Sequence, residues 1–281
     1  MTRLGALGAR LRLVHPFPSF LNGVAVLVMA SIAGGSVPTV IRLSVAMVLI
    51  QFAIGSLNDV ADAPRDTDRV PVKPIAVGLI RASTAQGVAV VAGLGGLILA
   101  ALSGPITLVV AAVGLGCGVV YDLALSRTSF SWLPLTVALP LVPVFAWSGA
   151  VDRIPSDGLA IIPIAMLGGA GLALGNALVD LGADAARGRR TAAVAVGRTR
   201  GWTIHAVAVL GAAGAAVALR PPGGGVGAGV LFVLGIGTIL AGVLGLRTSA
   251  GTAWRLAWGL EAAGVSLTGL AWVLAAAGRP G

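Results

Sequence analysis

Residues 82–121 read ASTAQGVAVVAGLGGLILAALSGPITLVVAAVGLGCGVVY and hold no Asp, Glu, Lys or Arg over 40 positions. A membrane-spanning helix needs about 20 mostly apolar residues, so this stretch is long enough for two. Ser103-Gly104-Pro105 divides it near the middle, and glycine and proline are typical of turns. We therefore predict two membrane helices here, over residues 84–102 and 105–121.

The rest of the chain has the same character. It is 57% hydrophobic and only 10% charged over 281 residues, whereas soluble proteins carry about 25% charged residues. Its 42 glycines lie within apolar runs and fit close helix packing in a bilayer. We predict an all-α polytopic membrane protein, one domain over residues 1–281 in contact with membrane lipids. Nine spans are expected, near residues 16–36, 38–57, 84–102, 105–121, 131–150, 158–180, 202–219, 225–246 and 256–277.

The net charge of +9 does not indicate nucleic-acid binding. Nucleic-acid domains gather Lys and Arg on polar faces, whereas here the basic residues lie in short gaps between apolar stretches. Most of them fall on one side of the bilayer if the N-terminus is cytoplasmic. We predict a multi-pass cell-membrane protein in that orientation. The long polar gaps 58–83 and 181–201 would then form an active-site cap on the cytoplasmic side.

Acidic residues concentrate in the first gap and around the start of the second. Asn58, Asp62 and Asp66 are spaced by four, with Asp59 between them, and the same spacing recurs further along the chain. The second set is Asn176, Asp180 and Asp184. Residues four apart share one face of a helix. Each window is therefore expected to present an amide oxygen and two carboxylates along one stripe.

Two such stripes are expensive near lipid unless a cation lies between them. We predict that the stripes belong to two halves of a pseudo-symmetric bundle and face each other. Mg²⁺ prefers oxygen ligands, usually a few carboxylates together with substrate phosphates. Calcium also accepts oxygen, but no EF-hand loop is present. The alternative is a solvated charge cluster at helix ends, which leaves the matched spacing unexplained.

Basic residues interleave with the acids, and a metal with Arg or Lys is the usual holder of a diphosphate. Lys73 is the only lysine, and a charge that fixes orientation is an equally good interpretation of it. Arg187 is a weaker candidate, since the positive-inside rule also explains it. Tyr121 ends the fourth span, where an interfacial belt is the alternative. Glu261 lies within the last span and is expected to snorkel or to pair with Arg255.

The first window resembles the signature of the UbiA family of intramembrane prenyltransferases. Asn58, Asp59, Asp62 and Asp66 match the pattern N-D-x-x-D-x-x-x-D in full. The following residues 71–80, PVKPIAVGLI, resemble the continuation P-x-K/R-P-x-x-x-G-x-I. Asp180 and Asp184 match the second pattern, D-x-x-x-D. One departure is Arg127, which stands one position beyond the Lys that many members carry after the tyrosine of the fourth helix.

The resemblance implies nine transmembrane helices around a central cavity and two Mg²⁺ ions that hold a prenyl diphosphate. Asn58, Asp62, Asp180 and Asp184 would be the metal ligands, directly or through water. Asp59 and Asp66 would support them, and Lys73, Arg127 and weakly Arg187 would contact the diphosphate. Tyr121 would face the allylic cation through its ring, and Asp59 or Asp184 would take the proton that the acceptor releases.

The expected reaction is transfer of a prenyl group from a prenyl diphosphate to a small acceptor in the membrane, such as an aromatic compound or quinone precursor. A terpene cyclase on the same fold would use the diphosphate without an acceptor. An ion-coupled transporter is the main rival that is not an enzyme, although transport sites usually lie near the midplane. A CDP-alcohol phosphotransferase is disfavoured because its D-G-x-x-A-R pattern is absent.

Overall fold

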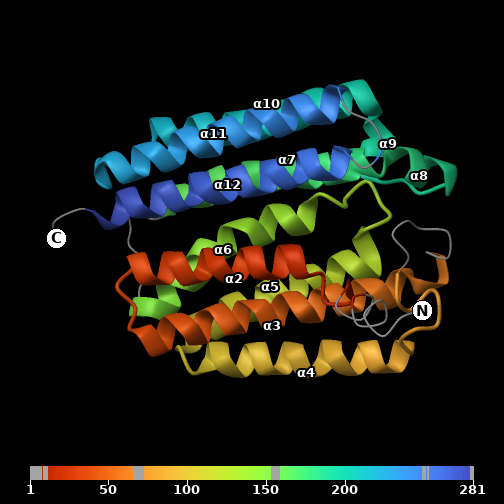
Figure 1. Ribbon diagram of the computed structural model, residues 1–281, viewed down its shortest axis with the longest axis horizontal. Helices are drawn as coiled ribbons and strands as arrows, with labels where there is room; N and C mark the ends of the chain where they lie inside the picture. Colours follow the sequence, from red (N-terminus) through yellow and green to blue (C-terminus); the bar gives the residue numbers. More distant parts are fainter. Residues whose placement is uncertain are drawn as a thin grey trace. The chain divides into compact units, whose positions relative to one another are not determined.

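The computed structural model describes Gly8 and residues 12–65, 73–152, 159–248, 251 and 253–278, with the side chain of Arg65 left aside. The elements of this part of the chain are all helical (Figure 1). The long helices are α2 (Pro16–Ile32), α3 (Val37–Asp62), α4 (Ala82–Ala101), α5 (Pro105–Val120), α6 (Leu133–Val151), α7 (Ile161–Val179), α10 (Arg198–Ala218), α11 (Gly225–Thr248) and α12 (Ala253–Ala277). The short elements are η1 (Ala63–Arg65), the π-helical turn η2 (Tyr121–Leu125), α8 (Leu181–Ala186) and α9 (Ala192–Val196).

The predicted spans correspond one to one with these long helices. Eight of them are long and apolar enough to cross a bilayer, and α2 is a shorter apolar helix of 17 residues. The charge-free stretch divides as predicted, because Gly104 adopts a φ of 114° that favours glycine, and Pro105 begins α5. The all-α polytopic architecture is therefore confirmed.

The chain forms two compact units. Unit 1 comprises Met1–Leu123 and Ser148–Asp152, and unit 2 comprises Ala124–Trp147 and Arg153–Gly281. In unit 1, helix α3 packs against both α2 and α4. Glycine makes one of these contacts possible: a Cβ at Gly96 of α4 would lie 2.8 Å from Ile50 Cγ1 of α3. Small residues thus bring the backbones together, as expected in lipid.

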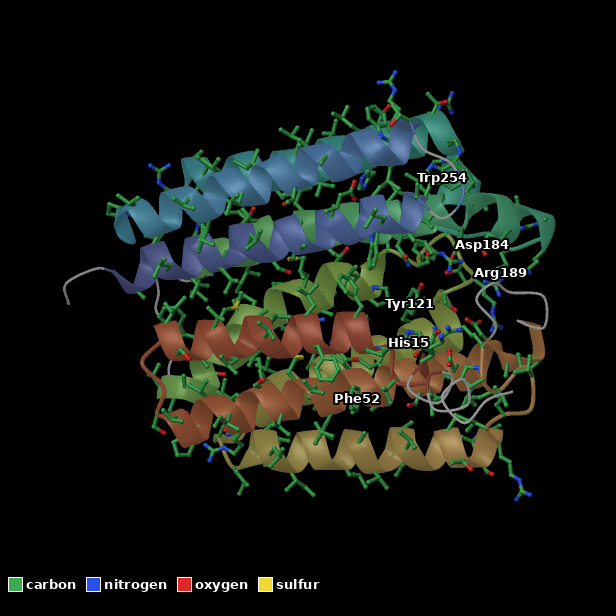
Figure 2. All side chains as sticks on the ribbon, in the orientation of Figure 1. His15, Phe52, Tyr121, Asp184, Arg189 and Trp254 are labelled. Atoms are coloured by element: carbon green, nitrogen blue, oxygen red, sulfur yellow. The ribbon has the colours of Figure 1, made fainter. Side chains whose placement is uncertain are left out.

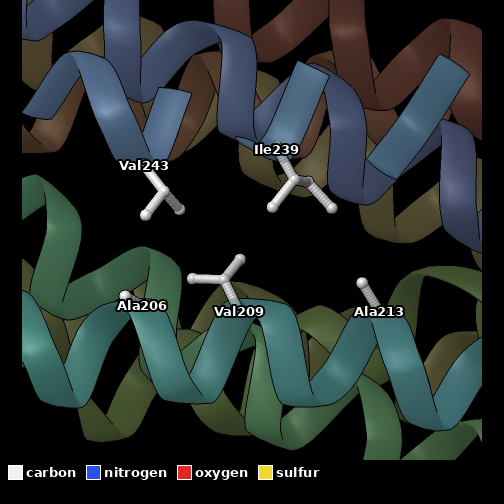
Figure 3. Close-up of a cluster of buried hydrophobic side chains, with 5 residues drawn as sticks. All are labelled: Ala206, Val209, Ala213, Ile239 and Val243. Atoms are coloured by element: carbon white, nitrogen blue, oxygen red, sulfur yellow. The ribbon is translucent and has the colours of Figure 1, made fainter. Parts of the chain in front are cut away.

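Unit 2 contains α7 to α12 and most of α6. Its apolar core includes a cluster between α10 and α11 (Figure 3). Val209 of α10 is fully buried there, and Ile239 of α11 is 1% exposed. Helices α11 and α12 approach even more closely, since a Cβ at Gly264 would lie 2.6 Å from the carbonyl oxygen of Gly235.

Large apolar side chains also cover the outside of both units. Val91 in unit 1 and Val233 in unit 2 are each 72% exposed, and Leu244 is 57% exposed. Soluble proteins avoid extensive apolar surface of this kind. A bilayer is the solvent that suits it, which agrees with a multi-pass membrane protein.

Candidate functional site

Asn58, Asp59 and Asp62 of the first acidic motif lie in the last two turns of α3. The apolar sequence of this helix continues to Asp62, and Pro64 follows one residue after the cap residue Ala63. Proline is common just past a helix end because it cannot continue the helix. Asp59 is 1% exposed and Asp62 9% exposed. Helix α3 therefore carries two largely buried carboxylates at its C-terminal end.

Lys73 lies against this motif. Its Nζ is 3.0 Å from Asp59 Oδ1, 3.2 Å from Asn58 Oδ1 and 3.4 Å from Asp62 Oδ2. The side chain is only 12% exposed. A lysine ammonium can donate three hydrogen bonds, and here three motif oxygens surround it. The predicted residues Asn58, Asp59, Asp62 and Lys73 are thus brought together, around a cation that the chain itself supplies.

Two residues that sequence reasoning did not select complete the cluster. His15 Nε2 lies 3.1 Å from Asp59 Oδ1, and the His15 ring rests against Gly55 of α3. Asn58 Nδ2 donates to Asp122 Oδ1 at 2.9 Å. Asp122 gave a sequence signal, since it is an acid at the end of an apolar span. His15 gave none, because no local pattern links it to a residue 44 positions away. His15 and Tyr121 are labelled in Figure 2.

The second acidic motif differs from the prediction. Helix α7 ends at Val179, and α8 begins at Leu181, so Asp180 occupies the junction with φ −97° and ψ 6°. Asn176 is exposed on α7, and Asp184 is buried on α8. The prediction of one continuous helical stripe is therefore wrong here. The carbonyl oxygen of Asp180 accepts the backbone N–H of Asp184 at 2.9 Å, so Asp180 caps the start of α8.

The break has a local cause. A helix end leaves carbonyl groups without helical partners, and basic side chains often satisfy them. Arg198, the first residue of α10, donates from Nη2 to the carbonyl oxygen of Leu178 at 3.3 Å. Its guanidinium also lies over the ring of Trp254, 4.2 Å from the centroid. Arg198 therefore stabilises the end of α7 one turn earlier than the sequence pattern indicates.

Asp184 pairs with Arg189, whose Nη1 lies 3.1 Å from Asp184 Oδ1 (both are labelled in Figure 2). Burial raises the pKa of the Asp184 carboxyl above its ordinary value, and the positive charge of Arg189 opposes that shift. Asp180 is more open, with a side chain that is 35% exposed and 4.0 Å from Arg255. Exposed ion pairs of that kind contribute little.

The predicted diphosphate contacts lie in different settings. Arg187 is exposed at the end of α8, whereas Arg189 is the residue that pairs with Asp184. Arg127 is half-buried, and its carbonyl oxygen accepts the backbone N–H of Arg190 at 3.2 Å. Tyr121 is half-buried at the first position of the π-helical turn. Asp66 lies outside the described residues.

The surroundings of Glu261 differ from the expectation. Glu261 is fully buried and bonds His205 rather than snorkelling or pairing with Arg255. His205 Nε2 lies 3.1 Å from Glu261 Oε1, and His205 Nδ1 lies 2.7 Å from the carbonyl oxygen of Gly171. Because a carbonyl only accepts, Nδ1 carries the proton. The pair thereby joins α7, α10 and α12 within unit 2, one turn before Asn176.

The comparison with protein families gives a match over most of the chain. Residues 19–262 match the UbiA prenyltransferase family. A digeranylgeranylglyceryl phosphate synthase from Methanoculleus marisnigri is 29% identical over 195 residues, which cover 68% of this chain and 70% of that protein.

Solved structures share the fold. A UbiA homologue from Archaeoglobus fulgidus, bound to DMAPP and Mg²⁺, has a TM-score of 0.72 at 16% identity, with 95% of this chain and 98% of that chain covered. A UbiA homologue from Aeropyrum pernix K1 has a TM-score of 0.71 at 17% identity, with 92% and 97% covered. At these identities the likeness concerns the fold, and the family assignment rests on the match over residues 19–262. The chain belongs to the UbiA prenyltransferase family, whose members transfer prenyl groups.

Proposed function

We propose that the chain transfers a prenyl group from a Mg²⁺-bound prenyl diphosphate to a small acceptor within the membrane. The observation that carries this proposal is the first motif, where Asn58, Asp59 and Asp62 place three oxygens around the Lys73 ammonium. Amide and carboxylate oxygens around a positive charge are also the ligand types that Mg²⁺ selects. Asn58 and Asp62 of this motif, with Asp180 and Asp184 of the second, are the proposed metal ligands.

The charge of the first cluster favours a divalent ion. Three carboxylates, those of Asp59, Asp62 and Asp122, meet one lysine and one histidine. Asp122 Oδ2 is buried and has no hydrogen-bond partner among the described residues. A buried carboxylate is costly unless a cation balances it. Negative charge therefore remains for an added cation, and the solved Archaeoglobus homologue with DMAPP and Mg²⁺ supports Mg²⁺ in that role.

The residues of the chain would act on the diphosphate and on the prenyl group separately. Bound Mg²⁺ supplies charge stabilisation of the leaving diphosphate. Lys73, Arg127 and Arg187 would bind its remaining oxygens, while Asp59 and Asp66 hold the ligand residues in place. The bond from the prenyl C1 to oxygen breaks and the diphosphate keeps the electron pair. The ring of Tyr121 would stabilise the allylic cation, and apolar helices would exclude water.

The acceptor then forms the new bond to C1 and loses a proton, which Asp59 or Asp184 would take. The sequence alone favours an aromatic or quinone-precursor acceptor, whose ring carbon is the nucleophile. The Methanoculleus relative, a digeranylgeranylglyceryl phosphate synthase, favours a second candidate, a lipid glycerol phosphate whose hydroxyl is the nucleophile. Both candidates need the same diphosphate site, which we propose lies on the cytoplasmic side.

The test uses the full chain in lipid vesicles with radiolabelled geranylgeranyl diphosphate, with Mg²⁺ or EDTA. An aromatic quinone precursor and a geranylgeranylglyceryl phosphate are offered in separate reactions. We expect a labelled lipid product and released diphosphate in one of them, and only with Mg²⁺. A prenyl hydrocarbon formed without acceptor would identify a cyclase instead. Transfer that persists undiminished in EDTA would contradict the metal-dependent scheme.

A further inference from the structure

Asp122 is a buried acid that the proposed reaction does not use. It lies in the π-helical turn η2, where it is 3% exposed while its neighbour Leu123 is 63% exposed. Single π-helical turns are rare and occur frequently at functional sites. This turn directs the Asp122 carboxylate to the C-terminal end of α3, where Oδ1 accepts a hydrogen bond from Asn58.

That hydrogen bond decides which end of the Asn58 amide faces the cation. An amide has a donating nitrogen and an accepting oxygen, which are hard to tell apart by shape. Here the chemistry of the partners settles the assignment. Lys73 only donates, so the amide oxygen faces the ammonium and the amide nitrogen is left to face Asp122. Asn58 Nδ2 must therefore face Asp122 at 2.9 Å, and Asn58 Oδ1 must face the Lys73 ammonium at 3.2 Å.

We propose that Asp122 is a positioning residue of the first cation site: it holds Asn58 so that the amide oxygen, not the amide nitrogen, faces the cation. This inference rests on the proposed function, in which Asn58 is a Mg²⁺ ligand. Without Asp122 only the Lys73 ammonium orients the amide, and a turned amide would present two N–H donors to a positive ion. The alternative is a purely structural hydrogen bond between α3 and the end of α5.

The experiment measures Mn²⁺ binding by electron paramagnetic resonance, with Mn²⁺ as a paramagnetic substitute for Mg²⁺. The full chain in nanodiscs is titrated in the presence of geranylgeranyl thiolodiphosphate, which resists turnover. Asp122→Ala removes the acceptor, and Asp122→Asn keeps an oxygen that can accept. Asp152→Asn is the matched control, because Asp152 lies in the same unit and is exposed.

We expect Asp122→Ala to weaken Mn²⁺ binding by about tenfold or more, as loss of a residue that orients a metal ligand usually does. Asp122→Asn should stay within about threefold of the native chain, because its amide oxygen still accepts from Asn58. The control should bind as the native chain does. The inference is overturned if Asp122→Ala stays within twofold of native, or if Asp122→Asn is as weak as Asp122→Ala.

A rescue variant separates orientation from folding. A carboxylate has two equivalent oxygens and cannot turn the wrong end to the metal, so Asn58→Asp should no longer need Asp122. We expect the double variant Asn58→Asp with Asp122→Ala to recover Mn²⁺ binding to within about threefold of native. A double variant as weak as Asp122→Ala alone would overturn the inference. If the native chain itself binds no Mn²⁺ in the presence of the thiolodiphosphate, the proposed function fails too. If the native chain binds Mn²⁺ but Asp122→Ala binds it equally well, only the positioning role of Asp122 fails.

Discussion

The two acidic motifs share one spacing but differ in structure. The first lies on the end of a single helix, is largely buried, and holds a lysine ammonium among its oxygens. The second crosses a helix junction, with Asp180 partly open and Asp184 paired with an arginine. The same spacing therefore gives different local structures, because the partners at each helix end differ.

The double variant Asp62→Ala with Asp180→Ala tests whether both motifs are needed, and it carries the largest expected effect. Each change removes a proposed metal ligand, so prenyl transfer should fall by about a thousandfold or more. The measurement is Mg²⁺-dependent product formation in vesicles, with Asp152→Asn as control. If the double variant transfers prenyl groups as fast as the native chain, neither motif can be assigned to the reaction.

Lys73→Met tests the internal cation of the first motif. The Lys73 ammonium binds oxygens that a metal ion would also bind. Removal of the ammonium should therefore tighten Mn²⁺ binding by about tenfold when no diphosphate is present. Transfer should nevertheless fall, because Lys73 is a proposed diphosphate contact. Arg81→Met, which removes an exposed cation from the same unit, is the control. Weaker Mn²⁺ binding in Lys73→Met would argue against competition for these oxygens.

Arg189→Gln tests the ion pair between Arg189 and Asp184 through the pH dependence of activity. The positive charge of Arg189 lowers the Asp184 pKa against the effect of burial. Its loss should raise that pKa further, and the carboxylate that we propose as a metal ligand will then form only at higher pH. Activity is lost as pH falls through this pKa, so the acidic limb of the pH–rate profile should move to higher pH. Arg187→Gln should leave the limb in place, and equal shifts in both variants would contradict the pairing.

Gly55→Ala and Gly175→Ala give the smallest effect and compare the two motifs directly. Each glycine faces a histidine ring: an added Cβ would lie 3.1 Å from His15 Cγ or 2.7 Å from His205 Cε1. His15 is 35% exposed and can move, whereas His205 is fully buried. Gly175→Ala should cost about 1–3 kcal/mol by overpacking, and Gly55→Ala less. Thermal unfolding in one detergent measures the stability of both variants. A larger loss of stability in Gly55→Ala than in Gly175→Ala would contradict the prediction that His205 is held more tightly than His15.

The membrane helices could be predicted from the sequence because bilayer thickness sets a length that apolar runs must meet. The hydrogen bond from Arg198 to the end of α7 could not, because Arg198 lies beyond the motif. Asn58, Asp59, Asp62 and Lys73 were found together because they are close in sequence. His15 and the partner of Glu261 were missed since tertiary packing alone brings them into place. The roles of Arg127, Arg187 and Tyr121 stay predictions.

The buried His205–Glu261 pair also constrains how unit 2 is assembled. Helix α10 enters the bilayer with His205 and α11 follows, yet Glu261 arrives only with α12. A polar side chain left alone in hydrocarbon is costly. His205 Nδ1 can bond Gly171 of α7 once α10 is in place, whereas Nε2 gains its partner only with α12, so a chain that lacks α12 should hold α10 less firmly.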